Sequence, residues 1–432
     1  MYSALTVPGS FRMKGVLAGR ETHLIVLLTS VVFLTSWAIC IQIFPPTDDV
    51  VNFFNNAELM KSGLLPYKDF VFEFPPLSLP LFLIPSIFTS DLTVYTWLFG
   101  LEVVISAVVV QYFLMRMCEV VGLNRGLVAL MFGALVILYF SESLKKFDMM
   151  AMLFTVLAFY FFATGRRTLA YAMFAVGAFI KMYPALFIPL LMAMDLSEKG
   201  IRGLRDIAAG LMACIAILII SVLPLCCLSV SLSDVFSFMG FHSDRGFQVE
   251  SFVAIIIQGM SLIGLTSFEL IGSHWTYDVV NPICDLLQPY WMKVSVVIII
   301  VSMALALIGF LRMSENLDNR SRFRVFVAST GMILIVFLLV NKVFSTQYTI
   351  WLFPIVAILV SLDGRTLSVP MAVIGLAVQF FSVFIVLNDS GSTPFIIANI
   401  LRDASLIIML IMVSAYLLFG RGPLRDPPSE FF

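Results

Sequence analysis

Residues 24–44, LIVLLTSVVFLTSWAICIQIF, form an apolar stretch without a charged residue, and the pair Pro45-Pro46 follows it. A helix that crosses a bilayer needs about 20 mainly apolar residues, so the stretch predicts a transmembrane helix. It is too long for the apolar core of a signal peptide and has no small-residue cleavage site. We therefore expect it to be retained as the first of several spans.

The composition of the whole chain agrees with a membrane protein. Of its 432 residues, 60% are apolar and 12% are charged, and the mean hydropathy is +1.02. A soluble domain cannot hide so much apolar surface, because even a large one buries only about three-quarters of what the unfolded chain exposes. This excludes a soluble enzyme and a disordered protein. A net charge of −1 without a basic block excludes a dedicated nucleic-acid binder.

Cysteine and histidine usage excludes two further classes. The six cysteines form no CxxC pair, and most lie in or beside apolar runs, which is typical of small core residues and not of a disulfide framework. The three histidines are far apart and match no HExxH or HxxxH spacing. We therefore expect no zinc site built by the protein.

We expect an all-α polytopic membrane protein with about twelve transmembrane helices in a single transmembrane domain, residues 1–432. Each span must be helical, because lipid offers the backbone amides no partner. The predicted spans are residues 24–44, 92–115, 126–140, 148–163, 168–180, 184–195, 206–229, 291–311, 324–341, 349–362, 367–388 and 403–420. Residues 77–89 and 253–268 are apolar but interrupted, and predict re-entrant or interfacial segments.

The distribution of Lys and Arg predicts the orientation. With the first span starting in the cytoplasm, 17 of the 26 basic residues fall in cytoplasmic segments. The positive-inside rule then favours two cytoplasmic termini and a cell-membrane protein whose first loop is extracytoplasmic. The nine basic residues left outside are Lys61, Lys68, Lys145, Lys146, Lys181, Arg245, Lys293, Lys342 and Arg402. Either they snorkel at the ends of spans or they serve a function.

The first extracytoplasmic loop, residues 45–90, is rich in acids and proline. Apolar residues at helical spacing over 50–61 predict an interfacial helix, which Gly63 can end. The pair Pro75-Pro76 prevents a straight helix from crossing the membrane there. We expect short helices lying on the outer face. The acidic side chains of this loop are Asp48, Asp49, Glu58, Asp69 and Glu73.

Asp48 and Asp49 have two interpretations. Either residue can simply cap the helix that follows, as aspartate often does. Yet both lie at the membrane edge of a chain poor in charge, where ionisable residues are functional candidates. Three further segments are expected on the same side of the membrane: Phe179–Pro184, Phe241–Ser251 and Asn341–Tyr348. Together they bring lysine, arginine and tyrosine to a carboxylate. A lipid-phosphate substrate needs this combination, since cations hold the phosphate and the carboxylate takes a proton.

Several motifs then resemble glycosyltransferase family 87 of the GT-C superfamily. The first loop contains Asp49, a short helix and the string Gly63-Leu64-Leu65-Pro66-Tyr67-Lys68-Asp69-Phe70, followed by Glu73-Phe74-Pro75-Pro76. Further matches are Lys146-Phe147-Asp148, Lys181-x-Tyr183-Pro184, Arg245-Gly246-x-Gln248-x-Glu250-Ser251 and Lys342-x-Phe344-Ser345-x-Gln347-Tyr348-x-x-Trp351. The chain departs from the family at Phe53–Asn56, where relatives often carry tyrosine and tryptophan, and this weakens any inference about the acceptor.

The resemblance implies a GT-C-like helix bundle that transfers a sugar, commonly mannose, from a polyprenyl phosphate outside the cytoplasm. It gives Asp49 the role of catalytic base, with Asp48 as its possible surrogate. The residues then expected to bind substrate are Tyr67, Asp69, Glu73, Lys181, Tyr183, His242, Arg245, Glu250, Lys342, Gln347 and Tyr348. For His242 and for the tyrosines a structural role fits the sequence equally well.

The expected reaction is a single inverting displacement. Asp49 takes the proton of an acceptor hydroxyl, which attacks the anomeric carbon as the lipid phosphate leaves, while Lys181, Arg245 and Lys342 are candidates to hold the phosphate. The scheme requires no cofactor and no metal. Besides membrane lipid, the expected partners are the polyprenyl-phosphate sugar and a glycolipid, glycan or protein acceptor. Two alternatives are a lipid or sugar transporter or flippase, and a non-catalytic scaffold. No convincing repeat supports a transporter.

Overall fold

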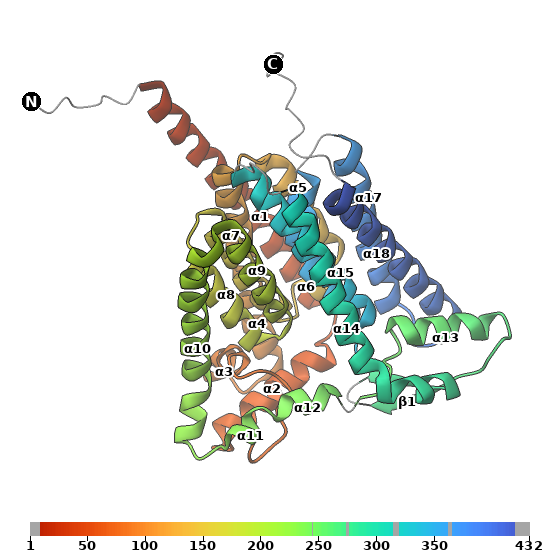
Figure 1. The fold of residues 1–432 in the computed structure, drawn as a ribbon. Coiled ribbons are helices and arrows are strands. Elements are labelled where there is room, and N and C mark those ends of the chain that lie inside the picture. Colours follow the sequence, from red (N-terminus) through yellow and green to blue (C-terminus); the bar gives the residue numbers. More distant parts are fainter. Residues whose placement is uncertain (1–8, 244, 274–275, 314–318, 362–364, 420–432) are drawn as a thin grey trace, which may run out of the picture.

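The computed structural model describes residues 9–243, 245–273, 276–313, 319–361 and 365–419 (Figure 1). The chain folds as a bundle of long helices with short helices and one hairpin at its lower end. The α-helices are α1 (Gly9–Ile43), α2 (Asp48–Lys61), α3 (Ser78–Ile87), α4 (Leu92–Val121), α5 (Arg125–Leu138), α6 (Phe140–Ser143), α7 (Asp148–Ala163), α8 (Arg167–Ile180), α9 (Phe187–Lys199), α10 (Gly203–Cys227), α11 (Leu232–Val235), α12 (Ser237–Ser243), α13 (Phe252–Leu262), α14 (Pro282–Met313), α15 (Asn319–Val340), α16 (Phe353–Val360), α17 (Arg365–Val386) and α18 (Thr393–Phe419). Three 3₁₀ helices, η1 (Tyr183–Leu186), η2 (Gly200–Arg202) and η3 (Thr346–Leu352), and two strands, β1 (Glu269–Ser273) and β2 (Thr276–Val280), complete them.

Seven helical segments among the described residues are long and apolar enough to cross a membrane. One of them, Tyr183–Cys227, joins two of the predicted spans. Six shorter apolar helices of 10–17 residues account for the other predicted stretches, with α3 and α13 where re-entrant or interfacial segments were expected. The multi-pass membrane protein is therefore confirmed, whereas the count of about twelve spans stays a prediction.

The long helices run between two ends of the molecule (Figure 1). The start of α1 and the end of α18 lie together at one end. Helices α2, α3, α11, α12 and α13 and the strands gather at the opposite end. The first loop thus lies across the bundle from both ends of the helical chain.

Small residues allow the membrane helices to approach closely. A Cβ atom added at Gly100 of α4 would clash with the indole nitrogen of Trp37 on α1. One added at Gly210 of α10 would clash with the Tyr171 ring of α8. Such contacts are typical of helices packed within a bilayer, where van der Waals packing replaces the hydrophobic drive.

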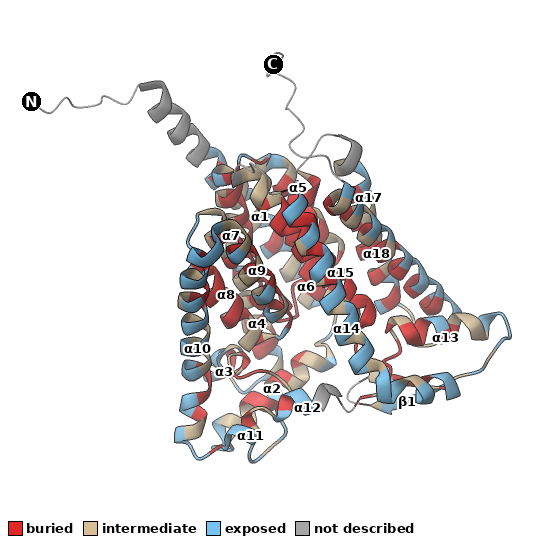
Figure 2. Cartoon of the chain, in the orientation of Figure 1, coloured by how far each residue is buried: buried red, intermediate tan, exposed pale blue. Residues whose placement is uncertain are grey.

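Burial separates central helices from peripheral ones (Figure 2). Helix α15 is buried along most of its length, and Ala328, Ile333 and Leu334 are fully covered. Helix α10 instead exposes Met212 and Ile215 as part of an apolar outer face, and α14 does the same along its length. An exposed apolar face suits contact with lipid tails.

The first loop folds on an aromatic core. Helix α2 buries Val50, Phe53 and Ala57, which recur at helical spacing. The Phe53 ring stacks on Phe82 with centroids 4.2 Å apart and meets the Phe147 ring edge-on at 5.4 Å. The helix ends at Lys61, and Gly63 follows with a φ of +92°, as the sequence predicts. This core fixes the start of α2 against the segment that precedes α7.

A two-stranded hairpin adds to the expected all-α fold a feature that the sequence analysis does not predict. Strand β1 pairs with β2 in antiparallel register, Glu269 opposite Val280. With α13, the start of α14 and the start of α18 the hairpin forms a small second core that includes Phe247, Val279 and Phe395. The main chain of this core anchors the segment 245–251, because Val249 donates to the Tyr277 carbonyl.

Candidate active site

The site begins where the chain turns from α1 into α2. Asp48 and Asp49 occupy the first turn of α2, where the positive end of the helix dipole favours a carboxylate. The Asp48 side chain is exposed. The Asp49 carboxylate turns inward, and its Oδ2 lies 2.5 Å from the ammonium nitrogen of Lys146. About a third of the Asp49 side chain, 34%, remains exposed, so a substrate can reach it.

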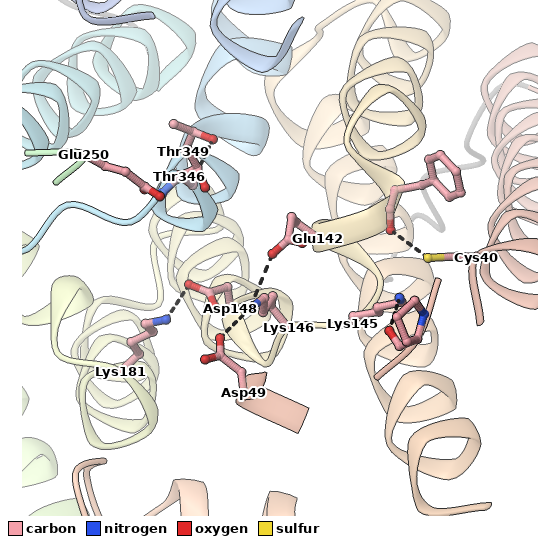
Figure 3. A network of polar contacts seen from close by, with 12 residues as sticks. Cys40, Asp49, Glu142, Lys145, Lys146, Asp148, Lys181, Glu250, Thr346 and Thr349 are labelled. Atoms are coloured by element: carbon pink, nitrogen blue, oxygen red, sulfur yellow. Dashed lines mark hydrogen bonds and ion pairs between the residues drawn. The ribbon is translucent and has the colours of Figure 1, made fainter. Parts of the chain in front are cut away.

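Lys146 belongs to the short segment between α6 and α7 and is shared by two carboxylates. Its Nζ also lies 3.4 Å from Oε2 of Glu142, on the other side of the ammonium group from Asp49 (Figure 3). Only 9% of the Lys146 side chain and 10% of the Glu142 side chain are exposed. The neighbouring Lys145 turns away and donates to the carbonyl oxygens of Phe44 and Pro45.

A second ion pair lies beside the first. Asp148, fully buried at the start of α7, accepts hydrogen bonds from the Lys181 ammonium and from the Trp351 indole nitrogen, each at 2.6 Å. Rings also surround the Lys181 ammonium: it lies 4.6 Å from the Phe147 ring and 4.9 Å from the Tyr348 ring. The ends of α7 and α8 and helix η3 therefore meet at one cation.

Helix η3 brings the motif 342–351 to the site. The side chain of Gln347 lies close enough to Asp49 to help lower the pKa of this carboxyl. Tyr348 stacks on Trp351 with centroids 4.4 Å apart, and Trp351 stacks on Tyr183 at 4.2 Å. The Tyr183 hydroxyl is 3.0 Å from that of Thr155. Two rings of this stack, those of Tyr348 and Trp351, lie beside the Lys181 ammonium.

The carboxyls of the first loop differ in protonation. Burial acts to raise the pKa of Asp49, but the Lys146 ammonium outweighs it and holds this pKa below its ordinary value. Burial, together with the Asp49 charge, raises the pKa of Glu73 to about 7. Glu73 is held by Asn52, whose amide donates to it at 2.9 Å. At neutral pH Asp49 is therefore ionised, whereas Glu73 can carry a proton.

Arg245 supplies a cation near this carboxyl pair. Its side chain is 93% buried, since its relative exposure is 7%. Its charge acts on both Glu73 and Tyr348. The guanidinium Nε has no hydrogen-bond partner within the described residues. A buried guanidinium nitrogen without a partner is suited to an anionic ligand.

Other predicted residues are engaged in local structure. The Asp69 carboxylate accepts the Leu65 amide at 2.7 Å within its own turn. Tyr67, at a φ of +69°, donates its hydroxyl proton to the Phe74 carbonyl at 2.6 Å. Both contacts stabilise the loop between α2 and α3. A substrate-binding role for them stays a prediction.

Glu250 and Lys342 tie two segments of the site together. The Glu250 carboxylate accepts the backbone amide of Thr346, the first residue of η3, at 2.6 Å. The Lys342 carbonyl accepts the backbone amide of Gln248 at 2.9 Å. Burial raises the pKa of Glu250 to about 7. The side chain of His242, also predicted to bind substrate, lies outside the described part of the structure.

Sequence reasoning did not assign roles to several residues that the structure brings into this site: Glu142, Lys146, Asp148, Trp351 and Asn52. For Lys146 and Asp148 the sequence offered one indication, because the triplet Lys146-Phe147-Asp148 is among the motifs that resemble the family. No group of three or more His, Cys, Asp or Glu side chains among the described residues could hold a metal ion. That no metal is needed stays a prediction.

Comparison with known proteins decides the family. The model of glycosyltransferase family 87 matches residues 72–338, more than half of the chain. The chain belongs to glycosyltransferase family 87. This family member is a glycosyltransferase, as its motifs predicted. The matched residues include Glu73, Lys146, Asp148, Lys181 and Arg245, whereas Asp49 precedes them.

Two solved structures are also similar to this chain. One is the crystal structure of ArnT from Cupriavidus metallidurans bound to undecaprenyl phosphate, with 13% identity, a TM-score of 0.48, and coverage of 91% of this chain and 77% of that one. The other is the same protein in the apo state, with 11% identity, a TM-score of 0.47 and the same coverage. The chain matches no curated protein.

Proposed function

We propose that this family 87 glycosyltransferase moves a sugar, with mannose as the first candidate, from a polyprenyl phosphate to a glycolipid or glycan acceptor on the extracytoplasmic face. The observation that carries the proposal is the inward-turned Asp49 carboxylate, which is ionised, partly exposed and flanked by the Lys146 and Lys181 cations. The excess of Lys and Arg in the segments predicted to be cytoplasmic supports two cytoplasmic termini. The site is at the opposite end of the bundle (Figure 1).

The acceptor hydroxyl attacks the anomeric carbon of the donor from the face opposite the phosphate. The oxygen–carbon bond to the acceptor forms as the carbon–oxygen bond to the phosphate breaks, and the phosphate leaves with the bonding electrons. Asp49 takes the hydroxyl proton, which makes the acceptor oxygen a better nucleophile. One displacement inverts the configuration, so a β-linked donor gives an α-linked product.

Charge stabilisation of the leaving phosphate falls to Lys181, Arg245 and Lys342. Arg245 is the strongest candidate because its Nε has no partner among the described residues and its planar guanidinium can bind two phosphate oxygens. Lys181 already has Asp148, so a phosphate must compete with that carboxylate or approach the open side of the ammonium. Preorganised cations of this kind are commonly the largest contribution to catalysis.

A donor assay with the purified protein in lipid vesicles tests the proposal. The donors are radiolabelled polyprenyl-phosphate mannose, polyprenyl-phosphate glucose and the soluble nucleotide sugars, each offered with a membrane glycolipid extract. We expect an α-linked product from a polyprenyl-phosphate sugar and no product from the nucleotide sugars. Transfer from a nucleotide sugar in vesicles free of polyprenyl phosphate would refute the donor class.

A further inference from the structure

One cation serves two carboxylates at the centre of the site. The Lys146 ammonium lies 2.5 Å from Asp49 and 3.4 Å from Glu142 (Figure 3). Glu142 lies four residues before Lys146, so both belong to the short turn between α5 and α7, whereas Asp49 comes from the first loop. The proposed mechanism uses Asp49 and leaves Glu142 without a role.

The mechanism creates a need for a second partner of Lys146. When Asp49 accepts the acceptor proton it becomes neutral, and the buried ammonium then loses its nearest counter-charge. An unpaired charge in a desolvated site is unfavourable, so a lysine paired with Asp49 alone would oppose the proton transfer. A second carboxylate in reach of the same ammonium removes this opposition.

We propose that Glu142 is a positioning residue that holds the Lys146 ammonium while Asp49 takes the acceptor proton. The inference rests on the function proposed above and deepens it. In the resting state Lys146 keeps Asp49 ionised and ready to act as a base. As the proton moves from the acceptor oxygen to Asp49, the ammonium shifts its pairing to Glu142, and Asp49 later releases the proton to water.

The surrounding charges leave Lys146 as the cation that both carboxylates share. The charge of Lys145 also acts on Glu142, but Lys145 donates to two backbone carbonyls next to the end of α1. The charge of Lys181 also acts on Asp49, but Lys181 is paired with Asp148. The titratable and charged groups that act on this cluster are Cys40, Asp49, Glu73, Tyr139, Glu142, Lys145, Lys146, Asp148, Lys181, Arg245, Glu250, Tyr348 and Arg402.

Glu142→Gln tests the inference while nearly preserving shape. With Glu142 neutral, Lys146 pairs with Asp49 alone and makes it a weaker base. We expect kcat to fall about tenfold, a fraction of the roughly 10²–10⁴-fold total for general-base catalysis, with an unchanged KM for the donor. Glu58→Gln is the matched control, because it breaks a lysine–glutamate pair of 2.8 Å on the exposed side of α2. It should leave kcat unchanged.

The size of the kcat loss caused by Glu142→Gln should depend on Lys146. Lys146→Met removes the cation, so the pKa of Asp49 rises and the acid limb of the kcat/KM profile moves to higher pH. In that background Glu142→Gln removes a nearby negative charge, and the limb should move back to lower pH without further loss of kcat. The same substitution thus slows the wild type and does not slow the Lys146→Met enzyme. Lys146→Gln repeats the cycle if the methionine variant fails to fold.

Two outcomes would overturn the inference. One is a Glu142→Gln enzyme with wild-type kcat. The other is the same fractional loss in the presence and absence of Lys146, with no shift of the pH profile, as a purely structural role predicts. Asp49→Asn, measured beside them, separates this failure from that of the proposed function. Wild-type turnover of Asp49→Asn removes the proposed base, whereas an inactive Asp49→Asn with either outcome above removes only the role of Glu142.

Discussion

The Asp148–Lys181 pair allows the structural and the functional contributions of one lysine to be separated. Asp148 is fully buried, and only 13% of the Lys181 side chain is exposed. Removing one partner of such a pair leaves an uncompensated buried charge and typically destabilises a protein by about 3–5 kcal/mol. In Asp148→Asn the amide oxygen still accepts from Trp351, and the rings of Phe147 and Tyr348 still face the ammonium, which favours the lower limit. We expect a loss of about 3 kcal/mol.

Lys181→Met should cost a similar amount, because it leaves the Asp148 carboxylate without its cation. The double variant Asp148→Asn/Lys181→Met buries neither charge, so its unfolding free energy should return to within about 1 kcal/mol of wild type. Its activity should nevertheless stay low, with a raised KM for the donor, because the phosphate has lost Lys181.

Denaturant unfolding in detergent micelles gives the stability of the three variants, and the vesicle transfer assay gives their kinetics. Arg116→Gln is a suitable control, since it breaks a partly exposed pair with Glu119 on α4, at the opposite end from the site. Recovery of wild-type activity along with stability in the double variant would refute a functional role for Lys181. Full stability of Asp148→Asn would refute the energetic argument itself.

Three further predictions follow from the same geometry. Substitution of Arg245 should raise the donor KM more than the acceptor KM. In Arg245→Lys a point charge replaces the two-pronged guanidinium, and in Arg245→Ala no cation remains. An unchanged donor KM in both variants would show that Arg245 does not bind the phosphate. Asn55→Cys, on the exposed side of α2, should react with an impermeant thiol reagent from the extracytoplasmic side, and labelling from the cytoplasm alone would reverse the topology. The pKa of Glu73 is raised from 4.5 to about 7 in the folded state. Between pH 4.5 and pH 7 the folded protein therefore binds more protons at Glu73 than the unfolded chain does, so the contribution of Glu73 to stability falls as the pH rises through this range. Glu73→Gln should flatten this part of the plot of stability against pH, and an unaltered plot would contradict the raised pKa.

Sequence patterns predicted the helical elements well because the bilayer restricts what they can be. The apolar stretch 148–163 coincides with α7, and the interfacial helix predicted over 50–61 is α2, Asp48–Lys61. The sequence analysis did not predict the hairpin of β1 and β2. Its strands have five residues each, and the exposed Ile271 and Tyr277 break any simple alternation of polar and apolar residues. Its Val279 belongs to a small core with residues of α13, α14, α17 and α18, and such tertiary contacts often outweigh local strand preference.

The site was predictable only where its residues lie in distinctive strings. Asp49 stood out at the membrane edge and Lys181 within a turn between spans. The partner of Asp49 could not be identified, because Lys146 lies 97 residues away and has an adjacent lysine of identical chemistry. In the structure Phe147, next to Lys146, packs edge-on against Phe53 of α2, whereas Lys145 donates to the carbonyls of Phe44 and Pro45. Likewise the sequence predicts that Glu250 binds substrate, whereas in the structure its carboxylate accepts the backbone amide of Thr346 at the start of η3.

The most direct test of the central claim is the single-turnover rate of Asp49→Asn with saturating polyprenyl-phosphate sugar. Asparagine keeps the size of the side chain, and Lys146 keeps Glu142 as a counter-charge, but the amide cannot accept the proton. The account predicts normal insertion, folding and donor binding with transfer at least about a hundredfold slower, and a smaller loss for Asp48→Asn. Transfer by Asp49→Asn near the wild-type rate would contradict the account. If Asp48→Asn then lost its activity, the base would be the neighbouring residue.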